Sequence, residues 1–481
     1  MVSKRKSKVL SLSLSQGLLT LITLFSSMVF TRIITKDSYA TYLQTFLAYD
    51  FVKPILTLGL PVALYNLLPN EARGKKIVLE VVLLLFGAGV FFSLFMFLGG
   101  TDIMAIRFNN PELSVSLRWM TIFPLYTYPV LCLSSILIVN NQVKINSWFN
   151  VVTGVLMFGL IIISLWVWKD YEHPLAVRVL FPLLVFPFGL YYCFHYTKGQ
   201  FEKPELSNMW RILKFAVPLG LATMIASIAT QFSNIVVSTL CSPSDYAVYS
   251  IGAKEIPFIS VVTGSIAVVV MADMSLLIKK GEINNSLNLF HKSAISSSFF
   301  LMPVMVFLFV FANYFVQVLF SSSYSDSAIP FRIFLLYLPI RIVQYNSVFI
   351  AFGQSKAVLL RSAIHLLFTI IFCVLFVWLW GYWGAAVGAI AASYLWAVPY
   401  NIKKLSELFR CRMLDVLPIK KICLIFLISC LCGILSSLAI FFKCNMLITL
   451  IVGAAIFIIS YYILMKRYFV DFKTLFLWKR S

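Results

Sequence analysis

The chain has 481 residues, of which 61% are hydrophobic and only 12% charged, and its mean hydropathy is +0.93. A soluble globular domain carries about twice that share of charged residues, so the composition excludes one and predicts a polytopic membrane protein. The net charge of +21 would suggest a nucleic-acid partner in a soluble chain. Here it fits the Lys and Arg residues that collect in cytoplasmic loops, and we expect no nucleic-acid binding.

The first apolar stretch, residues 9–34, follows the basic segment MVSKRKSK. This stretch is too long for the apolar part of a signal peptide, and it lacks a small-residue cleavage pattern. We therefore expect a retained first membrane helix.

The second apolar stretch, residues 36–69, carries Asp50 and Lys53 near its middle. A charge near the centre of a membrane helix costs about 2.5–3.5 kcal/mol, so such residues are candidates for a function. Their spacing of three places both on one helix face, where they can partly neutralise each other and face protein rather than lipid. Pro54 follows directly and Pro61 lies in a Gly-Leu-Pro segment two turns later. We predict a bent helix, hinged at both prolines, beside a gated cavity.

Apolar runs long enough to span a bilayer recur fourteen times. They cover approximately residues 9–34, 38–68, 77–99, 113–139, 147–167, 177–197, 211–239, 246–278, 289–311, 331–352, 357–379, 384–400, 420–442 and 445–465. An even number places both termini on one side of the membrane. Of the 39 Lys and Arg residues, 28 lie at the two termini and in or beside every second loop, whereas the loops on the opposite side hold 7. We expect a protein of the plasma (inner) membrane with both termini cytoplasmic.

The loops between these runs are short, none longer than about twenty residues, which leaves no room for a soluble catalytic domain. The chain lacks a Walker A pattern, and its nine cysteines show no metal-ligand spacing. We expect neither ATP binding nor a metal or organic cofactor. Residues 198–210 form a predicted cytoplasmic linker. Residues 401–421 suit either an interfacial helix or a solvated linker.

Similar residues recur in the two halves of the chain at nearly constant separations. Tyr39 matches Tyr246 at a separation of 207, while Gln142 matches Gln354 and Pro187 matches Pro399 at a separation of 212. We predict an all-α membrane protein with two six-helix lobes, residues 1–197 and 211–400, related by an axis along the membrane normal. Residues 401–481 then hold a second linker, an appended helix pair and a cytoplasmic tail.

The eighth apolar run repeats the mixed charge of the second. The repeat aligns Asp50 and Lys53 with two positions in the eighth run, and Lys254 and Glu255 lie roughly one helical turn closer to the start of that run. Pro257 follows them as a third predicted hinge. We expect each lobe to place a charge pair at similar depth. Such pairs suit a central cavity whose cations hold an anionic substrate, or salt bridges between the lobes, and both interpretations stay open.

Three further charged residues complete the candidates. Arg341 lies about three turns into the tenth run, too deep to reach the surface, and is predicted to line the cavity. Arg118 is a further substrate-binding candidate, but it lies near a helix end, as Arg178 does, and side chains there can snorkel to the surface. Asp273 is a candidate for a cation path, or a partner for the two lysines that follow it.

The opening of the chain resembles a known family. A basic first helix is followed by Asp-Ser-Tyr-Ala-Thr-Tyr at 37–42, Leu-Gly-Leu-Pro-Val-Ala-Leu at 58–64 and Leu-Leu-Pro at 67–69. This order resembles bacterial polysaccharide flippases of the multidrug/oligosaccharidyl-lipid/polysaccharide (MOP) exporter superfamily. The superfamily also includes the lipid II flippases and the multidrug and toxin extrusion (MATE) transporters.

The resemblance implies a transporter rather than an enzyme. Its substrate would be a polyprenyl pyrophosphate carrying an oligosaccharide repeat unit, moved by alternating access to the outer leaflet for capsule, O-antigen or exopolysaccharide synthesis. Partners would be this lipid-linked oligosaccharide, membrane lipid, a polysaccharide polymerase and glycosyltransferases. A pyrophosphate crossing hydrocarbon needs cations, which Lys53, Lys254 and Arg341 can supply. Asp50 and Glu255 could bind Na⁺ or a proton, or only tune the neighbouring lysines.

Two alternatives remain. A MATE-like drug exporter coupled to a cation should have an acidic, aromatic site, whereas four intramembrane cations here meet two central acids. A membrane glycosyltransferase or polymerase usually needs a large outer loop, and the outer loops of this chain are short.

Overall fold

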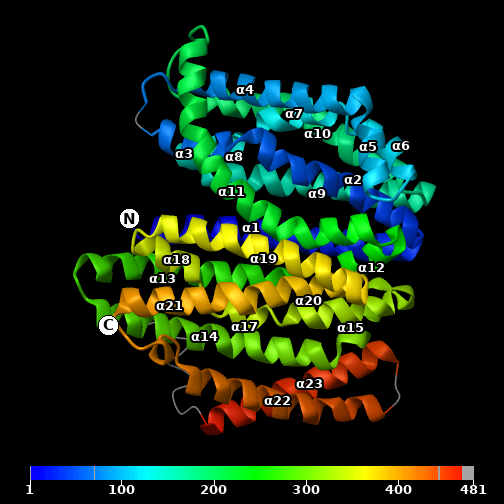
Figure 1. Cartoon of the computed structure of the whole chain (residues 1–481), viewed down its shortest axis with the longest axis vertical. Helices are drawn as coiled ribbons and strands as arrows, with labels where there is room; N and C mark the ends of the chain where they lie inside the picture. The colour runs from blue at the N-terminus through cyan, green and yellow to red at the C-terminus, as the bar shows by residue number, and fades with distance from the viewer. Residues whose placement is uncertain (1, 70, 443–444, 469–481) are drawn as a thin grey trace. The chain divides into compact units, whose positions relative to one another are not determined.

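All regular elements of the described residues are helical (Figure 1). The computed structural model describes residues 2–69, 71–442 and 445–468; the expected positions of Lys443 and of the tail at 469–481 fall outside them. A backbone in hydrocarbon must form its hydrogen bonds within the spanning segment, which helices do. The all-α class is confirmed, and the chain is a multi-pass membrane protein.

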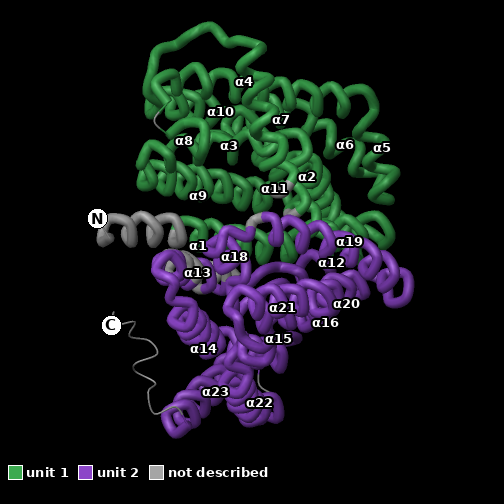
Figure 2. The backbone as a smooth tube through the Cα atoms, turned by 60° about the vertical axis from the view of Figure 1, so that its left-hand side comes forward, with its two compact units in different colours: residues 1–247 green, residues 248–481 purple. Residues whose placement is uncertain are grey.

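The chain folds into two compact units, Met1–Ala247 and Val248–Ser481 (Figure 2). Unit 1 contains α1 to α11 and the start of α12. Their bounds are α1 (Val2–Ile33), α2 (Lys36–Thr57), α3 (Leu60–Leu67), α4 (Gly74–Phe95), α5 (Thr101–Arg107), α6 (Glu112–Trp119), α7 (Phe123–Val130), α8 (Leu133–Val139), α9 (Val143–Trp168), α10 (Glu172–His195), α11 (Leu206–Leu240) and α12 (Pro243–Gly252). The expected lobe boundaries at 197 and 211 stay a prediction.

Unit 2 contains the rest of α12 and the helices from α13 onward. Their bounds are α13 (Pro257–Lys279), α14 (Ile283–Val310), α15 (Ala312–Phe320), α16 (Ala328–Leu335), α17 (Leu338–Arg341), α18 (Tyr345–Ala351), α19 (Ser355–Trp380), α20 (Tyr382–Ala392), a π-helical turn (Ser393–Ala397), α21 (Val398–Phe409), α22 (Ile419–Phe441) and α23 (Met446–Tyr468). The last two pack as a pair beside α14 (Figure 1). Of the two interpretations of residues 401–421, the structure shows a helix in the first part, because α21 continues to Phe409.

Among the described residues, ten helices are long and apolar enough to cross a membrane, or up to twelve if each of two bent pairs counts as one span. These twelve coincide with twelve of the fourteen predicted runs. The other two runs, 211–239 and 246–278, correspond to α11 and to α12 with α13. The total of fourteen spans stays a prediction.

The bend predicted in the second run is confirmed. α2 and α3 meet at an angle of 41°, where Leu58 and Gly59 both have left-handed backbone angles (φ 47° and 71°). Pro54 lies inside α2, but the helix continues for one more turn, and Pro61 lies in the first turn of α3, where proline fits well. The break itself therefore falls at Leu58–Gly59, between the two predicted hinges.

Helix α11 crosses this break at very close range. A Cβ atom on Gly220 would lie 2.3 Å from the carbonyl carbon of Leu58, and one on Gly59 would lie 2.4 Å from the Cα of Gly220. Both distances are far below van der Waals contact, and the blocking atoms belong to the backbone. Two glycines are thus required for α11 to pack against the α2–α3 break.

Replacing Gly220 with Ala should lower the stability of the folded protein by at least about 1–3 kcal/mol, the usual cost of overpacking. Thermal unfolding of the purified protein in detergent measures this loss. Gly87→Ala is the matched control, because a Cβ there meets nothing within 4 Å. Equal unfolding temperatures for the two variants would contradict the close crossing.

The predicted repeat is visible in local geometry at the start of α2 and α12. Thr35 caps α2 by accepting the backbone N–H of Ser38 on its hydroxyl at 3.3 Å. At a separation of 207, the Ser242 hydroxyl accepts the N–H of Asp245 at 3.1 Å. The carbonyls of the two capping residues each accept the N–H of the following tyrosine, Tyr39 or Tyr246, at 3.0 Å.

The separation of 212 residues between the two halves also recurs in the structure. α18 and α19 begin and end 212 residues after α8 and α9, residue for residue. The turns between them match: Gln142 donates its N–H to Leu137 at 2.7 Å, and Gln354 donates to Phe349 at 2.8 Å. The residue before each glutamine has a left-handed backbone. These parallels support the sequence repeat; the axis that relates the lobes stays a prediction.

An ionic cluster with a buried core, Lys76 and Glu80, fastens the start of α11 to α4. Glu80, which is fully buried, accepts the backbone N–H of Glu205 at 3.1 Å and the side-chain amide of Asn208. Lys76, 4% exposed, bonds to Glu205 at 2.5 Å and lies 3.6 Å from Glu202. The hydrogen bond from Lys76 holds the pKa of the Glu205 carboxyl below its usual range. The predicted linker 198–210 is thereby tied to unit 1.

Candidate functional site

The charge pair predicted on one face of the second helix is confirmed. The ammonium of Lys53 donates to a carboxylate oxygen of Asp50 at 2.7 Å, one turn away on α2. The side chains are 33% and 38% exposed. The pair sits just before the Leu58–Gly59 break.

An aromatic cluster borders the pair. Tyr49 is 5% exposed and packs edge-on against Phe92 and Phe123. The hydroxyl of Tyr49 is hydrogen-bonded to that of Thr127 at 2.9 Å, and the ammonium of Lys53 lies 5.4 Å from the centre of its ring. A cation near an aromatic face gains about 0.5–1 kcal/mol, or more when desolvated. Lys53 is therefore held by a carboxylate and a ring.

Sequence reasoning missed a polar network on the N-terminal half of α2. Buried Gln44 donates to the Ser238 hydroxyl on α11 at 3.0 Å and accepts from the Asn110 side chain at 2.6 Å. Asn110 also donates to Thr41 at 2.9 Å. The signal was available, because Thr41, Gln44 and Thr45 recur at helical spacing on one face. A fully bonded network of this kind fixes α2 against α11.

The eighth run is not a continuous helix, which corrects the prediction for Lys254 and Glu255. α12 ends at Gly252 and α13 begins at Pro257, so both charged residues lie in the non-helical segment between them. The cause is Pro257, since a residue before proline is disfavoured in the helical region, and Ile256 is extended (ψ 118°). Pro257 therefore starts a helix instead of bending one.

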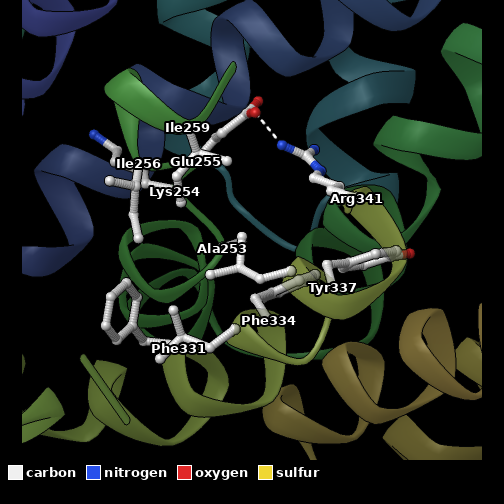
Figure 3. Close-up of a pocket in the computed structure, with 11 residues that line it drawn as sticks. Ala253, Lys254, Glu255, Ile256, Ile259, Phe331, Phe334, Tyr337 and Arg341 are labelled. Atoms are coloured by element: carbon white, nitrogen blue, oxygen red, sulfur yellow. Dashed lines mark hydrogen bonds and ion pairs between the residues drawn. The ribbon is translucent and has the colours of Figure 1, made fainter. Parts of the chain in front are cut away.

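Glu255 pairs with Arg341, not with the adjacent lysine. The guanidinium of Arg341, at the end of α17, bonds to the Glu255 carboxylate. Figure 3 shows Glu255 pointing toward Arg341, while Lys254 extends to the other side. The ammonium of Lys254 lies 5.8 Å from the centre of the Phe320 ring. The second ion pair thus joins residues 86 positions apart.

A small cavity of about 80 Å³ borders this ion pair (Figure 3). Besides Glu255 and Arg341, its walls include Lys254, Phe334 and Tyr337. Pockets that hold drug-sized ligands measure about 300–1,000 Å³, so a cavity of this volume is too small for an oligosaccharide.

The remaining candidates lie apart from these pairs. Arg118 is exposed in the last turn of α6, and Asp273 is exposed on α13. Arg178 packs its guanidinium 3.5 Å from the centre of the Phe46 ring and donates to the Tyr42 hydroxyl at 3.2 Å, so it is held inside unit 1. The described residues contain no group of three or more His, Cys, Asp or Glu that could hold a metal ion. That Lys53 converges with Lys254 and Arg341 stays a prediction.

The geometry defines a class of membrane protein: two helical units whose broken helices carry paired charges. The structure is similar to the lipid II flippase MurJ in an inward closed conformation (TM-score 0.75, 17% identity, 95% of this chain and 98% of that one). It is also similar to an inward-facing multidrug resistance MATE family transporter of the MOP superfamily (TM-score 0.66, 16% identity, 85% of this chain and 98% of that one). A third similar structure is a MOP superfamily transporter from Pyrococcus furiosus (TM-score 0.59, 16% identity, 83% of this chain and 96% of that one). The chain has the fold of a MOP-superfamily transporter.

The family follows from the sequence. Residues 6–272, more than half of the chain, match the model of the family described as polysaccharide biosynthesis protein, and the chain belongs to that family. No curated protein sequence matches the chain. The resemblance stated from the opening motifs is confirmed.

Proposed function

We propose that the protein is a flippase that moves polyprenyl-pyrophosphate-linked oligosaccharide repeat units from the cytoplasmic to the outer leaflet. The observation that carries this proposal is the match to a polysaccharide biosynthesis family in a chain with a MOP transporter fold. The structurally similar MurJ is a lipid II flippase.

The two ion pairs suit a pyrophosphate. A cation in a membrane segment is costly unless it is paired, and here Asp50 and Glu255 are the partners of Lys53 and Arg341. In this proposal, phosphate oxygens of the substrate replace the carboxylate as the partner of each cation. The released carboxylates then become available to bind Na⁺ or a proton, which is how Asp50 and Glu255 would take part in coupling.

The breaks beside these pairs suit alternating access. Leu58–Gly59 lies one turn after Lys53, and the segment 253–256 carries Glu255 itself. In the proposed cycle, bending at both breaks turns the cations first toward the cytoplasm and then toward the outside, while the lipid tail stays in the bilayer. The cavity beside Arg341 is small, so the sugars would occupy the space outside it.

A MATE-like drug exporter is the second candidate, because several MATE structures share the fold. Such a transporter would need free acidic groups for a cationic drug. Asp50 and Glu255 are both already paired with basic side chains, which favours an anionic substrate.

Reconstitution tests the proposal. Purified protein in vesicles should move a fluorescent polyprenyl-pyrophosphate-linked sugar from one leaflet to the other, and it should restore polymer export to cells lacking their own flippase. Efflux of cationic dyes without movement of the lipid-linked sugar would favour the MATE-like alternative.

The direction of transport depends on the topology, which labelling can test. We expect a cysteine at Ser323 to react with an impermeant thiol reagent from outside intact cells and a cysteine at Ser207 to react only after the membrane is opened. Both serines are exposed in the structure. The reverse labelling pattern would place the termini outside and overturn the proposed direction.

A further inference from the structure

Arg361 on α19 is a half-buried cation without a carboxylate partner among the described residues. Its guanidinium donates to the side-chain oxygen of Asn401 on α21 at 3.2 Å, and Asn401 is 2% exposed. The hydroxyls of Tyr345 and Tyr400 also act on Arg361 electrostatically, but a tyrosine carries no negative charge near neutral pH. The cations of the two ion pairs described above are each matched by a carboxylate, whereas the charge of Arg361 is not. A half-buried cation in this state favours an anionic ligand.

The place of Arg361 along its helix suits the phosphate of a lipid. α19 supplies the candidate membrane span Lys356–Trp380, and Arg361 lies in the second turn of the helix. Leu359 and Leu360, directly before it, are 41% and 54% exposed, so the arginine borders an outward-facing apolar surface. Basic pockets between membrane helices bind phosphate headgroups, and one guanidinium can donate two hydrogen bonds to a phosphate.

A ladder of aromatic rings runs along α19 from this arginine. Phe368 follows Arg361 by seven residues, which is about two helical turns, and so lies on the same face. Phe372, Phe376 and Trp380 continue at intervals of four. Neighbouring ring centres are 5.6, 6.0 and 5.0 Å apart along this series, and the last two pairs are stacked. The three phenylalanines are half-buried and Trp380 is 44% exposed, so the ladder stays accessible although α19 packs along α20 (Figure 1).

The length of the ladder indicates which lipid fits it. From Arg361 to Trp380 the helix rises about 28 Å, close to the thickness of about 30 Å of the hydrocarbon core of a bilayer. The acyl chain of a phospholipid stays within one leaflet, which is about half of that thickness. A polyprenyl carrier has a longer chain, which can follow the helix from one leaflet into the other. The full length of the ladder therefore favours a polyprenyl chain.

We propose that α19 is a binding site for a polyprenyl pyrophosphate, in which Arg361 binds the phosphate and the rings from Phe368 to Trp380 bind the chain. The inference rests on the proposed function, because it assigns a place in unit 2 to the carrier lipid of the transported substrate. Docking on α19 is a step separate from the exchange of partners at Arg341. It holds the lipid at the surface of unit 2 while the chain remains in the bilayer.

Binding of a long-chain polyprenyl pyrophosphate to the purified full-length protein in detergent tests this site. Arg361→Gln should bind it about 10- to 100-fold more weakly, the effect of losing hydrogen bonds to a charged group. Arg361→Lys keeps the charge without the two-pronged geometry and should lie between. Trp380→Leu should bind about two- to tenfold more weakly, the effect of one aromatic contact. Farnesyl pyrophosphate, whose short chain ends before Trp380, should lose affinity in Arg361→Gln but not in Trp380→Leu.

Arg412→Gln and Trp378→Leu are the matched controls. Arg412 is an exposed arginine in the segment after α21. Trp378 is 86% exposed, and it lies two residues from both Phe376 and Trp380, which places it on the opposite face of α19. Both controls should bind the long-chain and the short-chain pyrophosphate as the wild type does. Equal losses in Trp378→Leu and Trp380→Leu would mean that the ladder is not the binding face.

A photoreactive group at the far end of the long-chain probe locates the chain, and it should label α19 near Trp380. Labelling confined to α22 and α23, which border an apolar cavity beside Ala439 and Phe442, would overturn the inference. Displacement of the probe by an equal concentration of phosphatidylglycerol would also overturn it, since the site would then take phospholipid.

The transport assay separates this inference from the proposed function. If the reconstituted wild type moves the lipid-linked sugar while Arg361→Gln binds the probe normally, the inference is wrong and the proposed function stands. If the wild type neither binds the probe nor moves the lipid-linked sugar, the proposed function falls as well.

Discussion

Replacing Arg341 with Gln should reduce polymer export about 10- to 100-fold while leaving the amount of protein in the membrane nearly unchanged. A hydrogen bond to a charged group contributes about 1.5–3 kcal/mol, which corresponds to that range in rate or affinity. Arg341 is 41% exposed, so its loss removes a proposed partner of the substrate without opening a packed core. Export is measured as surface polymer in a flippase-deficient strain, and abundance by immunoblotting of membranes.

Arg332→Gln is the control for this variant. Arg332 lies on α16 and donates to the Phe309 carbonyl at 3.1 Å, so it is a neighbouring arginine without a carboxylate partner among the described residues. Export by this control should remain near the wild-type level. Equal losses in the two variants, or a parallel fall in protein abundance, would mean that Arg341 acts on folding and not on substrate.

Replacing Lys53 with Gln should reduce export by about tenfold or more, and adding Asp50→Asn should not restore it. The structure pairs the two residues at 2.7 Å, so the single variant both removes a cation and strands a carboxylate. If the second effect alone mattered, neutralising Asp50 would repair the damage. Comparing export in the two single variants and the double variant separates the two effects.

Lys53→Arg tests the chemistry of the same position. It keeps the charge but changes the donor geometry, so export should lie between those of the wild type and Lys53→Gln. Full recovery in the Lys53→Gln, Asp50→Asn double variant would show that Lys53 only neutralises Asp50 and would remove it from the proposed substrate site.

The bend in the second run was predictable because its causes are local. Pro54, Gly59 and Pro61 lie within eight residues, and Gly59 adopts the left-handed angle that glycine tolerates. The break at 253–256 had one local signal, the restriction that Pro257 places on the residue before it. From the sequence we predict a hinge at this proline, as at Pro54. In the structure Pro54 lies inside α2, whereas Pro257 is the first residue of α13.

The partner of Glu255 could not be predicted. Arg341 lies 86 residues away, and the adjacent Lys254 was the obvious partner by spacing. Once the helix breaks, neighbouring side chains no longer follow helical spacing, and Lys254 and Glu255 point to different sides (Figure 3). The pairing of Asp50 with Lys53 was predictable because α2 stays helical through both residues.

The cluster around Glu80 has a consequence for how the chain is made. When α1 to α10 have been synthesised, Glu80 is present but Glu205 and Asn208 are not, and the break at Leu58–Gly59 has no Gly220 to close over it. A ribosome must extend the chain to α11 before this carboxylate and the α2–α3 break acquire their partners. Unit 1 therefore completes its contacts at Glu80 and at the α2–α3 break only when α11, the seventh predicted span, is in place.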